Sequence, residues 1–204
     1  MKEKYIEDLK EIKDIMNRSS RFVSLSGLSG ITAGVSALIG AYLAHQTVYS
    51  HQDYLGYRIA TLTTDSLTQL LLIAAGTMIL AVGSVIFFTT LETKKKNQKI
   101  WDAQTKRLLI NLSIPLMAGG ILCLMLLSKG LLALVAPLTL LFYGLALVNA
   151  SKYTLSEIRS LGLLEILLGL IAVYFIGYGL LFWVIGFGIL HIVYGIIMHL
   201  KYKS

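Results

Sequence analysis

Six long apolar runs constrain the fold of this chain more than any other feature of its sequence. Each has about the 20 residues that an α-helix needs to cross the hydrocarbon core of a bilayer. The composition agrees, because 56% of the residues are hydrophobic and 14% are charged, against about 25% charged in a soluble domain. The sequence therefore predicts an all-α fold, a polytopic membrane helical bundle with six transmembrane helices as three hairpins in one domain, 22–204. The predicted spans lie near 22–44, 67–91, 108–127, 131–150, 161–178 and 180–200.

The positions of the lysines and arginines predict the orientation of these helices. All but two of the 18 basic residues precede the first run, lie between runs two and three or four and five, or follow the sixth. Arg58 and Lys129 fall on the opposite side. Basic residues are enriched in cytoplasmic loops, so we expect a multi-pass protein of the bacterial inner membrane with both termini in the cytoplasm. The net charge of +7 then forms a basic rim that attracts anionic lipid headgroups, by about 1 kcal/mol per residue, and not nucleic acid.

The arm before the first run, residues 1–21, has the pattern of a short amphipathic cytoplasmic helix. Apolar residues recur at three- and four-residue steps, opposite a face of acidic residues. We expect this helix to lie in the membrane interface or beneath the bundle. Its nearly balanced charge is poorly explained by lipid attraction alone, so docking to a second copy or to a cytosolic protein stays open. The face that would meet the membrane surface or a partner consists of Tyr5, Leu9, Ile12 and Met16.

Two ionisable residues interrupt the last two apolar runs. Glu165 lies near the cytoplasmic start of the fifth run, and His191 lies near the middle of the sixth. Counted from the turn near Gly179, their depths differ by about 3 Å at 1.5 Å per residue, so the side chains can meet if they face each other. One hypothesis is a proton-titratable pair in a polar cavity open to the cytoplasm, used for pH sensing or substrate coupling. The alternative is that Glu165 is neutral, or that a hydroxyl or amide group satisfies it.

Two asparagines stand in a similar relation to each other in the third and fourth runs. Asn111 and Asn149 lie at similar depths from the turn at Lys129, and we expect them to bridge helices. Pro115 and Pro137 interrupt the same two runs. Each proline frees a backbone carbonyl group that a neighbouring helix or water must satisfy.

Small residues recur at spacings that place them on one face of a helix. In lipid such residues let helix backbones approach closely, so they indicate packing surfaces in a tight bundle more strongly than the lining of a conduit. The sets are Ser26/Gly30/Gly34, Gly76/Gly83, Gly162/Gly169 and Gly188/Gly195.

Signals for catalysis or for a cofactor are weak. The sequence has none of the nucleophile-elbow, zinc-protease, phosphate-loop or dinucleotide motifs, so no catalytic residue, metal ligand or cofactor is assigned. This argues against an enzyme of known chemistry and leaves an unfamiliar intramembrane enzyme open. The outer loop 45–66 contains His45, His51 and Asp53, but their spacing does not form a compact metal site. Cys123 lies inside an apolar run and is expected to be an inert packing residue.

Four segments carry a family resemblance. They are DIMNRSSRFVSLSGLSGI at 14–31, RLLINLSIPLMAGG at 107–120, FYGLALVNASKYTLSEIRSLGLLEILLGL at 142–170 and GYGLLFWVIGFGILHIVYGIIMHLKY at 177–202. With these segments the chain resembles a family of small six-span inner-membrane proteins from Bacteroidota. The resemblance implies a Gram-negative inner membrane. The family has no established activity, so it implies nothing about mechanism.

Two classes of function follow from these observations. The first is a non-enzymatic sensor, regulatory or assembly module that acts through its cytoplasmic face. The second is a small transporter or channel with a cytoplasm-facing polar cavity that uses Glu165 and His191. Expected partners are the lipid bilayer, anionic headgroups, and either a second copy of the chain or a cytosolic protein.

Overall fold

The computed structural model describes residues 26–48, 53–54, 57–58, 64–95 and 101–202. Apart from two short strands, the regular elements in these ranges are helices, which confirms the predicted all-helical class. The predicted amphipathic arm, with Tyr5, Leu9, Ile12 and Met16, lies outside the described residues, and so does His51.

The first hairpin is formed by α2 (Gly27–Val48) and α3 (Thr64–Lys95). Between them, β1 (Asp53–Tyr54) and β2 (Tyr57–Arg58) pair antiparallel, with Asp53 opposite Arg58. His45 lies in the last turn of α2, so the helix extends past the predicted end of the first run.

The second hairpin is formed by α4 (Ala103–Ser128), the 3₁₀ turn η1 (Leu132–Leu134) and α5 (Val135–Ala150). Asp102 caps α4, because its carboxylate accepts a hydrogen bond of 2.7 Å from the backbone N–H of Thr105. The turn needs a glycine at Gly130, which has φ of 75°. Pro137 falls in the first turn of α5, where a missing N–H costs no helical hydrogen bond. The prediction that Pro137 interrupts the fourth run is therefore wrong.

The third hairpin follows a 3₁₀ turn, η2 (Ser151–Tyr153), and begins with α6 (Ser156–Tyr174). The return limb comprises α7 (Gly179–Trp183), η3 (Val184–Leu190) and α8 (His191–Tyr202), which follow one another without a break. The segment η3 is a π-helix, a wider helical form that is rare and frequently found at functional sites. Helix α6 is shifted toward the N-terminus relative to the predicted run at 161–178. It begins at Ser156 and ends at Tyr174, so the last residues of the run lie in the turn that follows.

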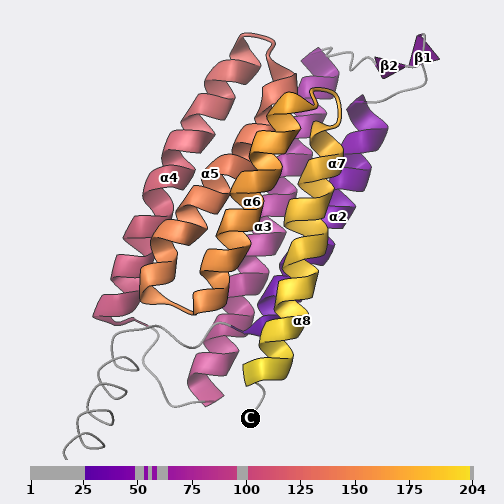
Figure 1. The fold of residues 1–204 in the computed structure, drawn as a ribbon. Helices are drawn as coiled ribbons and strands as arrows, with labels where there is room; N and C mark the ends of the chain where they lie inside the picture. Colours follow the sequence, from indigo (N-terminus) through magenta and orange to yellow (C-terminus); the bar gives the residue numbers. More distant parts are fainter. Residues whose placement is uncertain (1–25, 49–52, 55–56, 59–63, 96–100, 203–204) are drawn as a thin grey trace, which may run out of the picture.

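The three hairpins stand side by side, and their turns gather at one end of the bundle in Figure 1, shown at the top. The opposite end holds the starts of α2, α4 and α6 and the ends of α3, α5 and α8 (Figure 1). We call this the basic end, because it collects seven exposed basic residues among those described. They are Lys94, Lys95, Lys106, Arg107, Lys152, Arg159 and Lys201.

Glycines bring two pairs of helices into close backbone contact. A Cβ atom on Gly34 of α2 would lie 2.7 Å from the carbonyl oxygen of Gly188, and one on Gly144 of α5 would lie 2.6 Å from that of Gly162 in α6. These contacts confirm that the glycines of α2, α6 and the return limb are packing surfaces. The same prediction is wrong for α3, where Cβ atoms on Gly76 and Gly83 would meet nothing within 4 Å among the described residues.

Five of the described helical segments are long and apolar enough to cross a membrane, which indicates an integral membrane protein. Their outer surfaces are apolar as well, and Leu72 of α3, for example, is 68% exposed. Helix α6 is the exception, because it carries Glu157, Arg159 and Glu165 within its 19 residues. The segments are Gly27–Thr47, Thr64–Lys95, Ala103–Ser128, Leu132–Tyr153 and Gly179–Tyr202.

Candidate functional site

A cluster of three polar side chains lies inside the bundle, one from each of three helices. Tyr143 comes from α5, Glu165 from α6, and His191 is the first residue of α8. Glu165 is fully buried and His191 is nearly so. The structure thus brings together the two ionisable residues singled out from the sequence and adds a tyrosine to them.

The imidazole ring of His191 contacts three oxygen atoms. Its Nε2 atom lies 2.7 Å from the hydroxyl group of Tyr143, and its Nδ1 atom lies 3.0 Å from the carbonyl oxygen of Gly186. Nδ1 is also 3.5 Å from Oε1 of Glu165. A carbonyl oxygen only accepts hydrogen bonds, so in neutral His191 the hydrogen is on Nδ1, and Nε2 accepts from the Tyr143 hydroxyl group.

The carboxyl group of Glu165 has no comparable partners. Neither of its oxygens forms a hydrogen bond with any residue that the structure describes. Burying an isolated carboxylate costs several kcal/mol or more. In this arrangement, in which neither oxygen has a described hydrogen-bond partner, we expect the group to hold a proton or its charge to be balanced by a protonated His191 close by.

Gly186 shapes the space that the carboxyl group occupies. A Cβ atom at this position would overlap Oε2 of Glu165 and would lie 2.5 Å from Cδ2 of Leu140, a fully buried side chain. The glycine therefore does two things at once. Its missing side chain makes room for Glu165, and its carbonyl oxygen accepts from His191.

Aromatic rings enclose the imidazole on the side of the π-helix. The ring of Phe187 stacks against that of His191, with centroids 5.8 Å apart and an interplanar angle of 19°. Tyr143 and Trp183 each contact Phe187, at centroid distances of 4.8 Å and 4.9 Å. The Phe187 ring thus covers one side of the imidazole with apolar surface, and a low-dielectric surrounding strengthens electrostatic interactions.

The two asparagines connect α4 and α5 by a hydrogen bond between the helices. Pro115 has no N–H to offer the carbonyl oxygen of Asn111, one turn earlier in α4. The side-chain amide of Asn149 in α5 fills that position, donating to the Asn111 carbonyl oxygen at 2.9 Å. The Asn111 side chain does not cross between helices and instead donates to the carbonyl oxygen of Arg107 at 2.8 Å.

The described residues contain no group of three or more histidine, cysteine or acidic side chains that could hold a metal ion. Cys123 is buried, and its thiol makes one long contact of 3.9 Å to the carbonyl oxygen of Val135. Neither observation points to metal binding or to a reactive nucleophile within these ranges.

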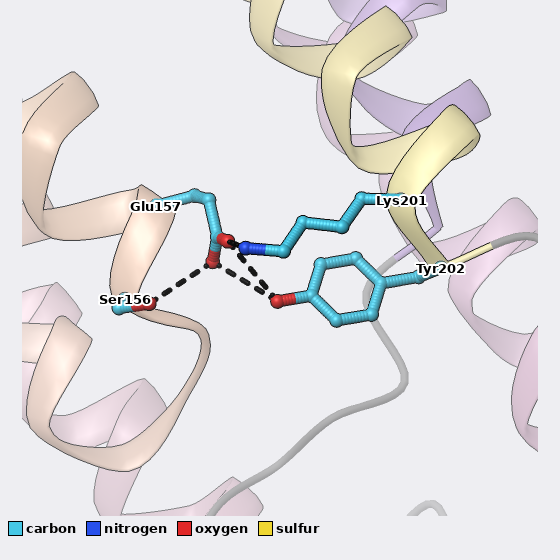
Figure 2. A network of polar contacts seen from close by, with 4 residues as sticks. All are labelled: Ser156, Glu157, Lys201 and Tyr202. Carbon is cyan, nitrogen blue, oxygen red and sulfur yellow. Dashed lines mark hydrogen bonds and ion pairs between the residues drawn. The ribbon is translucent and has the colours of Figure 1, made fainter.

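A second polar network joins α6 to α8 at the basic end, as Figure 2 shows. The Glu157 carboxylate pairs with Lys201, and it accepts from the Tyr202 hydroxyl group at 3.1 Å and from Ser156 at 3.2 Å. Partial burial by itself raises the pKa of Glu157. The hydrogen bond from Lys201, a backbone hydrogen bond and the hydrogen bond from Tyr202 together lower it by more than burial raises it. The net pKa therefore lies below its usual value, and this carboxylate stays charged at neutral pH.

Sequence reasoning missed Tyr143 and Gly186. Tyr143 lies nearly as far along the chain from the turn at Gly130 as Glu165 and His191 lie from Gly179. Comparing depths across all the runs would have found it. Nothing in the sequence marks Gly186, because its role depends on which side chain of α6 faces it.

Chemically, the cluster can bind a proton and move it between Glu165 and His191, with Tyr143 holding the far side of the imidazole ring. Its members are acid–base groups inside an apolar helical bundle whose helices are compatible with an integral membrane protein. Comparison of the chain with protein-family models, with curated proteins and with solved structures found no match.

Proposed function

We propose that this chain is a six-span protein of the bacterial inner membrane, with both termini and the basic end in the cytoplasm. Support comes from the five apolar helices and from the gathering of exposed basic residues at one end. In this topology α6 is the fifth of the six spans, and its three charged residues are accommodated at the membrane edge or within the bundle.

Within this topology the protein acts as a non-enzymatic proton-responsive sensor. The observation that supports this role is the buried carboxyl group of Glu165, which has no described hydrogen-bond partner and lies 3.5 Å from the His191 imidazole. Ionisable residues are rare inside membrane bundles and usually mark proton or ion sites. A structural role would be expected to satisfy the carboxyl oxygens, as the network around Glu157 does.

The two groups titrate as a pair. With one proton shared between them, the pair is either a neutral glutamic acid beside a neutral histidine or a carboxylate beside an imidazolium ion. Their separation is short enough for the charge on one to alter the proton affinity of the other. Protonation is therefore a property of the pair, and the surrounding helices respond to the net charge of the pair.

The basic end is proposed to meet anionic lipid headgroups. The seven exposed basic residues defined above would lie at the level of the headgroups in this orientation. A second copy of the chain or a cytosolic protein is the proposed recipient of the signal at the same face. These proposals rest on charge and orientation.

Infrared difference spectroscopy tests the sensor role directly. A protonated carboxyl group has a C=O stretching band that a carboxylate lacks, so the full-length protein in lipid nanodiscs should show a pH-dependent band from Glu165. The Glu165→Gln variant should lose this band. The Glu157→Gln variant is the matched control, since it changes a glutamate of the same helix, and it should keep the band.

The outcomes separate the possible roles. A spectrum in which the wild type and Glu165→Gln have the same pH-dependent bands contradicts the proposal. The titrating band together with proton flux through protein-containing vesicles would assign the pair to transport instead of sensing. The band without flux supports the sensor.

A further inference from the structure

The most informative feature of the cluster is that one N–H group faces two acceptors. Nδ1 of His191 lies 3.0 Å from the carbonyl oxygen of Gly186 and 3.5 Å from Oε1 of Glu165. The shorter distance meets the range for a hydrogen bond, and the longer one does not. In the state that the structure shows, the hydrogen is therefore donated to the π-helix and not to the carboxyl group.

We propose that His191 is a hydrogen-bond switch, which donates from Nδ1 to Gly186 while Glu165 is neutral and to Glu165 once its carboxyl group has lost its proton. This inference rests on the proposed titration of Glu165. Its new content is that the π-helix η3 loses the imidazole donor on one of its carbonyl groups when the proton leaves.

The charge on the carboxyl group decides which acceptor wins. A hydrogen bond to a carboxylate is roughly twice as strong as one between neutral groups. The proton of Glu165 leaves for the aqueous phase, and the resulting carboxylate attracts the Nδ1 hydrogen more strongly than the Gly186 carbonyl oxygen does. Closing the 3.5 Å gap requires a small rotation of one imidazole ring.

Tyr143 is the positioning residue for this switch. Its hydroxyl group lies 2.7 Å from Nε2 and occupies the opposite side of the ring. As a donor to Nε2 it keeps the hydrogen of neutral His191 on Nδ1, the atom that faces both acceptors. Without it, the hydrogen can move to Nε2, and the contact with the Gly186 carbonyl oxygen is lost.

Other titratable groups do not crowd the switch in the described part of the chain. Around His191, α5 contributes Tyr143 and α6 contributes Glu165, while α7 and η3 contain no titratable residue. Helix α2, which packs on η3 and α8, has Tyr42 and His45 in its last two turns. It approaches His191 earlier in the helix, where a Cβ atom on Gly30 would lie 3.2 Å from the His191 carbonyl oxygen. The switch is thus controlled by the pair itself.

The sequence allows this movement to be observed at one atom. Gly186–Phe187 is the only Gly–Phe dipeptide in the chain, so ¹³C-carbonyl glycine combined with ¹⁵N-phenylalanine isolates a single cross-peak. Solid-state NMR of the full-length protein in lipid bilayers then reports the hydrogen bonding of the Gly186 carbonyl group as a function of pH.

We expect the Gly186 carbonyl signal to move upfield as pH rises, in step with the loss of the Glu165 infrared band. In Glu165→Gln the signal should stay at its low-pH position throughout. In Tyr143→Phe it should be upfield at every pH, while the infrared band still titrates. A wild-type signal that stays fixed while the infrared band titrates overturns the switch and leaves the sensor intact. An infrared band that does not titrate overturns the sensor, and the switch fails with it.

Discussion

Helix α6 carries two glutamates that face the return limb, and they are satisfied in opposite ways. Glu157, at the basic end, accepts hydrogen bonds from Lys201, Tyr202 and Ser156 (Figure 2). Glu165, eight residues and about 12 Å further along the helix, accepts none from any residue within the described ranges. The same residue type on the same helix thus takes part in a polar network in one place and is buried without a described hydrogen-bond partner in the other. The difference comes from the number of donors within reach.

The largest expected effect comes from filling the space beside Glu165. In Gly186→Ala the new Cβ atom overlaps the Glu165 carboxyl group and crowds Leu140, so the free energy of unfolding should fall by about 1–3 kcal/mol. Titration of the purified protein with SDS in mixed micelles measures this change. Gly83→Ala is the matched control, because its Cβ atom meets nothing within 4 Å among the described residues, and it should leave stability nearly unchanged. Equal losses in both variants would contradict the assigned role of Gly186.

Replacing each glutamate with an apolar side chain should give effects of opposite sign. Glu165→Met removes a buried carboxyl group without hydrogen bonds and should stabilise the protein by about 1–2 kcal/mol. Glu157→Met removes the acceptor of three donors and should destabilise it. The same unfolding titration tests both, and destabilisation by Glu165→Met would show that its carboxyl group has a stabilising partner after all.

Removing the Tyr143 hydroxyl group should have an intermediate effect. Tyr143→Phe keeps the contact with the Phe187 ring but loses the hydrogen bond of 2.7 Å to His191, at a cost of about 1 kcal/mol. The loss should be smaller in a His191→Gln background, because the partner atom is then already absent. A double-mutant cycle measures this coupling, and additive losses would mean that the hydrogen bond contributes nothing.

The smallest effect is expected at the basic end, where Lys201 is exposed and solvent screens the ion pair. The net pKa of Glu157 is lowered from its usual value of 4.5, so its contribution to stability is present above that pH and is lost as pH falls through the lowered pKa. Unfolding curves of the wild type and Glu157→Gln should therefore differ slightly at neutral pH and converge in acid. A difference that grows in acid would contradict this sign.

Parts of this comparison were accessible from the sequence. The near-equal depths of Glu165 and His191 predicted that the two side chains can meet, and the structure places them 3.5 Å apart. Glycine spacing predicted the contact faces of α2, α6 and the return limb, but it failed on α3. Spacing identifies which residues share a face of a helix, and it does not say whether another helix lies against that face.

The asparagines show the same division. A freed carbonyl group at Asn111 follows from Pro115 alone, since proline has no N–H to donate. That Asn149 satisfies it depends on how α4 and α5 are rotated against each other. Likewise, the sequence analysis singled out Glu165 but not Glu157, which lies before the predicted fifth run, and it did not show which of the two has hydrogen-bond donors nearby.

By itself, the sequence determined the helical class and the apolar character of the helices, because long runs of apolar residues have few other stable arrangements in a bilayer. Only the tertiary structure decided that Tyr143 contacts His191 beside Glu165, that Gly186 leaves room for the Glu165 carboxyl group, and that the segment before His191, η3, is a π-helix. These features depend on the rotation of each helix about its own axis and on its contact with neighbours. A shift of one residue in helical phase turns a side chain by about 100°, and that is enough to separate any pair in this cluster.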